Sequence, residues 1–291
     1  MMNKNRIEYF FFSLFAKLFK LIGLNATRKL GKFLGSVVFY LVPIRKKVVL
    51  QNLTRAFPTK SNHEIKKIAL YNYQSITITF FEFMYFPSAA KQEMKSIIDI
   101  TLTDECKQIV AEKIGFMFLT AHFGNWELSA LSFPLMYDFI FHILAQPQRN
   151  PYVTKWSTDA REAFGNKVIM VGVSVRHIIE ALKKNGVVGL AGDQRGPVDS
   201  PRIDFLGVPT AYHLGTPTII LKTKSKVLVG FAIRQTDYNY KMNVEKLDLT
   251  NLIGSQKEQI IEIQNRYIRI LEKYVREYPE QYFWMHKIWK Y

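Results

Sequence analysis

Residues 116–127 read FMFLTAHFGNWE, an apolar run that ends in a histidine and, five residues later, a glutamate. The apolar pattern predicts a buried strand over Gly115–Ala121, and a helix is expected over Asn125–Met136. Strand ends that lead into helices are where α/β proteins place reactive side chains. His122 with Glu127 nearby suits a general base that removes a proton from a hydroxyl group. The spacing alone is equally consistent with a structural histidine.

Short apolar runs alternate with helical patterns in both directions from this stretch. Further strands are expected at Phe139–Ala145, Val168–Val171, Val187–Ala191, Val227–Arg234 and Tyr240–Lys246. Helices are expected at Asn62–Tyr85, Pro151–Phe164, Val175–Lys184, His213–Lys222 and about Ser255–Glu277. This alternation predicts an α/β fold with a mainly parallel central sheet covered by helices.

A second strand end carries Asp193, Gln194 and Arg195, directly after the strand expected at Val187–Ala191. Because ligands bind beyond the carboxyl ends of parallel strands, we expect these side chains to lie near His122. Gly124 permits a close backbone approach.

Asn125 stands where a helix N-cap is expected, and free main-chain amides near the histidine would receive developing negative charge. After the next strand come Arg149 and Asn150, and Arg161 lies on the helix that follows. An arginine there suits a phosphate or a thioester oxyanion. For Arg161 a solvated helix face is an equally good interpretation.

Other chemistries find little support in the sequence. No His-x3-His pair is present and Cys106 is the only cysteine, so no metal site is expected. Neither a phosphate-binding Gly-x4-Gly-Lys-Ser/Thr loop nor a Gly-x-Ser-x-Gly nucleophile motif occurs. His142 and His177 fall inside predicted elements and are interpreted as structural.

The net charge of +16 over 291 residues implies a polyanionic partner. Before Glu64 the only acidic residue is Glu8, and the basic residues there are interleaved with large apolar ones. That mixture favours an anionic membrane surface over a nucleic acid. The single cysteine indicates a cytoplasm-facing protein.

Two N-terminal runs, Tyr9–Leu24 and Leu30–Ile44, are apolar but carry a polar stripe at helical spacing. Both are shorter than the roughly 20 uninterrupted apolar residues of a membrane-spanning helix. Basic amphipathic helices lie in the plane of a membrane interface, so residues 1–45 are interpreted as a membrane-attachment segment and 46–291 as an α/β domain. A single tilted span and a cap on a soluble core remain as alternatives. No small-residue cleavage site follows, so a signal peptide is not expected.

Six blocks of the chain resemble one family, and they occur in its order. They are RKKVVLQNLTRAFP at 45–58, AHFGNWE at 121–127, QRNP at 148–151, GDQ at 192–194, DFLGVPT at 204–210 and PEQYFWMHKIWK at 279–290. Together they resemble the late acyltransferases of lipid A biosynthesis, the lauroyl/myristoyl transferase family within the lysophospholipid acyltransferase superfamily. The order GDQRGP departs from the family's usual pattern and leaves the identity of the acceptor open.

The resemblance implies a glycerolipid-acyltransferase-like domain on the cytoplasmic face of the bacterial inner membrane. It implies an acyl-carrier-protein or coenzyme A thioester as donor, a lipid acceptor and no bound cofactor. His122 would be the general base, and Glu127 would orient it and stabilise the imidazolium. The residues expected to bind substrate are Gly124, Asn125, Trp126, Arg149, Asn150, Arg161, Asp193, Gln194 and Arg195.

The most direct function is transfer of a fatty acyl group to a hydroxyl of a lipid A precursor or related membrane lipid. A lysophospholipid, an aminolipid or another glycolipid is an alternative acceptor. A peripheral membrane protein without catalytic activity is the alternative outside the enzymes.

Overall fold

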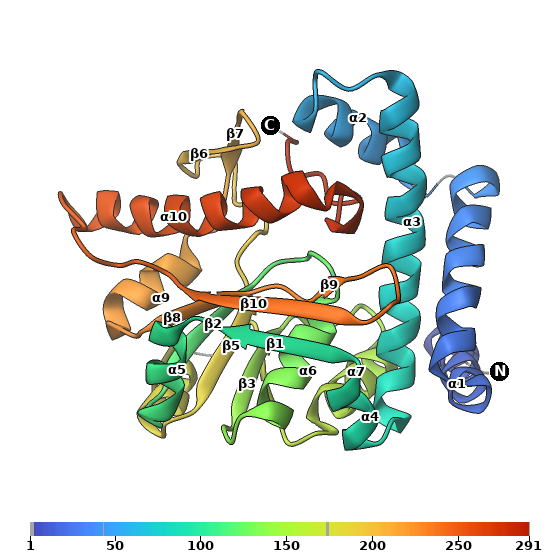
Figure 1. Ribbon diagram of the computed structural model, residues 1–291, viewed down its shortest axis with the longest axis horizontal. Helices are drawn as coiled ribbons and strands as arrows, with labels where there is room; N and C mark the ends of the chain where they lie inside the picture. The colour runs from blue at the N-terminus through green and yellow to red at the C-terminus, as the bar shows by residue number, and fades with distance from the viewer. Residues whose placement is uncertain (1–2, 43, 173–174, 291) are drawn as a thin grey trace.

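A computed structural model describes residues 3–42, 44–172 and 175–290, so Met1, Met2 and Pro43 of the predicted attachment segment lie outside it. The expected mixed α/β fold with a mainly parallel central sheet is confirmed (Figure 1). In spatial order its strands are β1 (Ile98–Leu102), β10 (Tyr240–Lys246), β8 (Val227–Gly230), β2 (Phe116–Thr120), β5 (Val187–Ala191), β3 (Phe141–Ala145) and β4 (Lys167–Met170). β10 is antiparallel to β8, and β9 (Ile233–Arg234) extends the sheet beside β10.

The central strands place the two predicted strand ends side by side. β2 pairs in parallel with β5, and Thr120 at the end of one strand is in register with Ala191 at the end of the other. The main chain therefore leaves the sheet at the same level just before His122 and just before Asp193. Every residue of β2 is buried, because helices cover both faces of the sheet.

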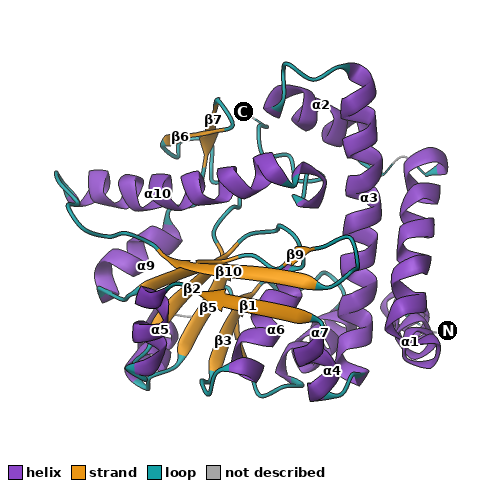
Figure 2. Ribbon diagram, in the orientation of Figure 1, coloured by secondary structure: helices purple, strands orange, loops and turns teal. Residues whose placement is uncertain are grey.

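Each face of the sheet has its own apolar core. Met117 and Leu119 point into one core, and Phe116 and Phe118 point into the other, as the two-residue period of a strand requires. Figure 2 shows α10 across the first face, with α4, α5 and α6 on the second. The helices of the domain are α2 (Lys46–Ala56), α3 (Asn62–Tyr85), α4 (Lys91–Ser96), α5 (Asp104–Ala111), α6 (Trp126–Met136), α7 (Pro151–Glu162), α8 (Val175–Lys183), α9 (Gly215–Thr223) and α10 (Gln256–Glu277).

The N-terminal runs form one helix, α1 (Lys4–Leu41), with a kink at Gly23, where φ is 78°. It stands along α3 at the side of the molecule (Figure 1). Gly35 permits the close approach, since a Cβ there would lie 2.6 Å from the Cα of Gln74. Within the described residues, no helix is both long enough and apolar enough to span a membrane.

Several elements differ from the sequence prediction. The strand expected over Val227–Arg234 is two strands, β8 and β9, separated by Phe231 and Ala232. β1 and the hairpin of β6 (Arg202–Phe205) and β7 (Val208–Ala211) were not predicted. The hairpin turns at Leu206 and Gly207, both with positive φ, and leucine at such a position is not a turn signal.

Candidate active site

The turn that joins β2 to α6 is held rigidly by main-chain hydrogen bonds. Gly124 adopts a φ of +60°, and a Cβ there would lie 2.0 Å from the carbonyl oxygen of Ala232. Gly124 N donates to the Gln281 carbonyl at 2.9 Å, and Asn125 N donates to that of Ala232 at 2.8 Å. Only glycine permits this approach, which fixes the path of the chain after His122.

His122 forms its side-chain hydrogen bond with Asp193. Its Nδ1 lies 2.9 Å from Asp193 Oδ1, and its main-chain N donates to Oδ2 at 3.1 Å. Because an ionised carboxylate only accepts, Nδ1 carries the proton and Nε2 is the basic nitrogen. The His122 side chain is 27% exposed and that of Asp193 is 4% exposed, so the carboxylate is sealed behind an accessible imidazole.

The electrostatics of this pair favour its charged form. Burial lowers the pKa of His122, but the charge of Asp193 and its hydrogen bond outweigh burial and raise that pKa above its ordinary value. Burial raises the pKa of Asp193, yet the His122 charge and hydrogen bonds lower it overall. Such a histidine is a stronger base than a free imidazole.

Glu127 has a different partner from the one that the sequence suggested. Its carboxylate accepts two hydrogen bonds from Arg161, Nε to Oε2 at 2.9 Å and Nη2 to Oε1 at 2.6 Å. The position that the prediction gave to Glu127, in contact with His122, is occupied by Asp193. Glu127 acts on His122 through its charge alone, which contributes to the raised pKa. The interpretation of Arg161 as a solvated residue is wrong, because this ion pair is largely buried.

A buried ionic cluster supports the turn from behind, and we call it the Glu82 cluster: Arg28, Glu82, Asn125, Arg234 and Tyr240. Glu82 Oε1 accepts from Arg28 Nε at 2.6 Å, and Oε2 accepts from Asn125 Nδ2 at 2.9 Å. Oε2 also accepts from Tyr240 Oη and Arg234 Nη2. Asn125 in turn caps α6, since its Oδ1 accepts from Leu128 N at 2.9 Å. The cluster thus ties the start of α6 to α1 and α3.

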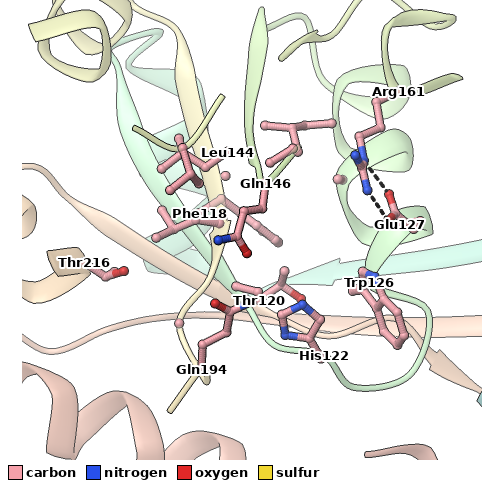
Figure 3. Close-up of a pocket in the computed structure, with 18 of the residues that line it drawn as sticks. Phe118, Thr120, His122, Trp126, Glu127, Leu144, Gln146, Arg161, Gln194 and Thr216 are labelled. Atoms are coloured by element: carbon pink, nitrogen blue, oxygen red, sulfur yellow. Dashed lines mark hydrogen bonds and ion pairs between the residues drawn. The ribbon is translucent and has the colours of Figure 1, made fainter. Parts of the chain in front are cut away.

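A cavity of about 540 Å³ opens beside His122 over the carboxyl ends of the parallel strands. Its size is in the range of small-molecule binding sites. Figure 3 shows His122, Trp126 and the Glu127–Arg161 pair along one side, with Gln146 and Gln194 near its centre. Its apolar wall includes Phe118, Ala130, Phe141, Ile143 and Leu144. The site therefore combines a base with space for an apolar chain.

A second cavity, of about 50 Å³, lies where His122 and Asp193 meet the C-terminal segment. Phe283, Tyr282 and His286 line it. Phe283 N donates to the His122 carbonyl at 2.9 Å, so the segment holds the histidine in place. Burial lowers the pKa of His286, which favours its neutral form. The C-terminal segment therefore completes the surroundings of the base.

Five predicted substrate-binding residues lie outside the lining of both cavities: Gly124, Asn125, Arg149, Asn150 and Arg195. Asn150 caps α7 and donates from Nδ2 to the Asn5 carbonyl at 2.8 Å, which ties α7 to α1. Arg195 donates to the Lys287 carbonyl, and Arg149 is exposed. Gly124 and Asn125 shape the turn. The prediction of free amides is wrong for Gly124, Asn125 and Leu128, whose N–H groups are already bonded.

Several lining residues were missed by the sequence analysis. Gln146 directly follows β3, and His122 lies two residues beyond the end of β2, so the strand-end rule that selected Asp193 could have found Gln146 as well. Thr120 is the last residue of β2 and was included in the apolar run. Phe283 and His286 come from the aromatic ending, and no local pattern indicates where that segment packs. Among the described residues, no group of His, Cys, Asp and Glu is arranged to hold a metal ion.

An imidazole paired with a carboxylate, placed at a strand end beside a large cavity, defines an α/β protein equipped for general-base chemistry. A model of the bacterial lipid A biosynthesis acyltransferase family matches residues 3–291, and the chain belongs to this family. The chain is 24% identical over 268 residues to the lipid A biosynthesis lauroyltransferase of Escherichia coli K12, covering 90% of this chain and 84% of that protein. It is also 24% identical over 273 residues to the palmitoleoyltransferase of the same organism, with the same coverage.

Proposed function

We propose that this protein transfers a fatty acyl group from a thioester to a hydroxyl of a lipid A precursor or a related membrane lipid. The observation that carries the proposal is the His122–Asp193 pair at the side of the 540 Å³ cavity. Family membership and the names of the two Escherichia coli relatives support the reaction class and the acceptor. The raised pKa of His122 supports its role as base.

The reaction needs one base and no covalent enzyme intermediate. His122 Nε2 takes the proton of the acceptor hydroxyl as its oxygen attacks the thioester carbonyl carbon. The tetrahedral intermediate then collapses, the C–S bond breaks, and the sulfur leaves with the proton that the imidazolium returns. Asp193 keeps the ring oriented and stabilises the imidazolium. Glu127 adds negative charge near the ring and holds Arg161 at the cavity wall.

The donor is an acyl-carrier-protein or coenzyme A thioester, and the protein itself carries no resident cofactor. The net charge of +16 supports docking of an acidic carrier or a nucleotide phosphate. The apolar wall of the cavity, which includes Phe118 and Phe141, suits the acyl chain. Both donors present the same thioester to His122.

The protein attaches to the cytoplasmic face of the bacterial inner membrane, and the surface of helix α1 supports the membrane attachment. Its outer surface exposes Phe10, Phe11, Leu14, Phe15 and Leu21, while its buried side packs on α3. The exposed basic residues of the same helix include Lys17, Lys20, Lys29 and Lys32. Apolar residues that enter a bilayer and lysines that contact anionic headgroups are the two components of an in-plane membrane helix.

The decisive experiment incubates the purified protein with one lauroyl thioester and a panel of acceptors: a lipid A precursor, a lysophospholipid, an aminolipid and a glycolipid. We expect the fastest transfer to the lipid A precursor and a loss of about 10²–10⁴-fold in the His122→Ala variant, the usual contribution of a general base. Liposome binding should be unchanged in this variant. Full activity of a folded His122→Ala protein would exclude the mechanism, and no turnover by the wild type would favour a non-catalytic membrane protein.

A further inference from the structure

Two glutamine side chains meet in the cavity beside the proposed base. Gln146 follows β3 and Gln194 follows Asp193 after β5, so both come from the carboxyl ends of adjacent strands. Figure 3 shows their amide groups reaching toward each other across the cavity, next to His122 and Thr120. We call this pair the amide collar. Both side chains are exposed, and no hydrogen bond joins either amide group to another residue that the structure describes.

A third polar group without a hydrogen-bonding partner among the described residues lies in the same cavity wall. Thr120 is only 7% exposed, and its hydroxyl has no hydrogen-bonding partner among the described residues. A buried hydroxyl without a partner is unfavourable, so a ligand that accepts a hydrogen bond from it gains affinity. The same residue lines the cavity, so a ligand bound there lies next to it. By contrast, Glu127 and Arg161, the charged groups of this cavity wall, form an ion pair with each other.

The chemistry of the amide collar selects the kind of ligand that completes it. A primary amide offers an acceptor and two donors without charge, so its best complement is another amide. A phosphate would gain more from arginine, and a purely hydrocarbon ligand would displace water from both glutamines without offering them a hydrogen-bonding partner. The ligand at the amide collar is therefore neutral and rich in amide groups.

Both candidate donors share such a group. Coenzyme A and acyl carrier protein present the acyl chain on a pantetheine arm that contains two secondary amides. We propose that Gln146 and Gln194 bind the amides of this arm, and that Thr120 donates to the carbonyl oxygen of the adjoining thioester. This inference rests on the proposed acyl transfer. It places the arm over the ends of β3 and β5, the thioester beside His122, and the acyl chain along Phe118 and Phe141.

The test compares two lauroyl donors, one carrying the full pantetheine arm and one a simple ethanethiol thioester without amides. The variants are Gln146→Leu and Gln194→Leu, with Gln108→Leu on the exposed face of α5 as the matched control. Loss of one hydrogen bond to the arm should raise KM for the pantetheine donor about five-fold in each collar variant. KM for the ethanethiol donor and KM for the acceptor should not change. Gln108→Leu should behave as the wild type with both donors.

Each other outcome overturns the inference in a recognisable way. Equal losses with both donors would assign the glutamines a structural role, which thermal unfolding of the variants would show independently. A higher KM for the acceptor instead of the donor would assign the amide collar to the acceptor lipid. No change in KM with either donor would show that the pantetheine arm does not bind to the two glutamines. Failure of the wild type to use any donor would instead contradict the proposed function.

Discussion

Two ionic arrangements lie on opposite sides of the same turn, and they differ in access rather than in chemistry. Behind the turn, the carboxylate of Glu82 is fully buried and accepts hydrogen bonds from side chains of α1, β9, β10 and the cap of α6. In front of it, Asp193 is 4% exposed, but its partner His122 is 27% exposed to the cavity. A closed cluster can only position the chain, whereas an open pair can also exchange a proton.

The two sides also differ in how completely their polar groups are hydrogen-bonded. A buried charge is tolerated only when its lone pairs and protons are used, and Glu82 meets this condition through four donors. Arg28 Nη2 is the exception on this side, since no described residue accepts from it. On the cavity side, polar groups such as Gln146 and Thr120 are left without partners, which is the arrangement expected where a ligand completes the site. Stability and function are therefore separable by mutation.

The largest effect on stability is expected from Glu82→Ala. The substitution leaves Arg28 and Arg234 buried without their carboxylate, so the free energy of unfolding should fall by about 3–5 kcal/mol. Urea unfolding in detergent would measure this loss. Glu112→Ala is the matched control, because its ion pair with Lys226 is on the surface and should contribute less than about 1 kcal/mol. If the two variants were equally stable, the buried cluster would not be what holds the turn.

The sequence predicted some elements around this turn and missed others. The strand and helix that flank His122 were predicted within one residue, because an apolar run and an N-cap are local signals. β1 was not predicted, because Ile98–Leu102 joins the edge of the sheet through pairing with the distant β10. Burial of Arg28 in α1 was also unpredictable, since its carboxylate partner lies 54 residues further along the chain.

For the site, the sequence predicted which residues come together but not how they pair. His122 and Asp193 were selected because both follow strands, and parallel register brings such ends together. The sequence could not show which carboxylate pairs with His122. Glu127 is close to His122 in sequence, but the first turn of α6 directs its side chain to Arg161 on α7. Which carboxylate contacts the imidazole is a property of packing between elements. The catalytic roles of His122 and Glu127 stay predictions.

The next prediction tests the open pair through Asp193→Asn. The amide cannot stabilise an imidazolium as a carboxylate does, so acyl transfer should fall about 10²-fold. The base works in its neutral form, so the rate rises with pH through the pKa of His122. Asp193 raises that pKa despite burial, so in the variant the increase in rate should occur at lower pH. The charges of Glu127 and Arg161 still act on the ring in the variant. A pH–rate profile of kcat/KM measures both effects. An unchanged profile would show that Asp193 does not set the basicity of His122.

The smallest effect is expected at Thr120, where activity should fall without a loss of stability. Valine has nearly the shape of threonine and removes a hydroxyl that has no partner, so Thr120→Val should keep the free energy of unfolding or raise it by about 1 kcal/mol. Transfer from the pantetheine thioester should nevertheless fall about five- to ten-fold, because a donor to the thioester carbonyl is lost. Thr120→Ser keeps the hydroxyl and should retain most of the rate. Unfolding curves and kcat measured on the same preparations decide this. A Thr120→Val protein that is less stable and fully active would show that the hydroxyl serves packing, as the groups of the Glu82 cluster do.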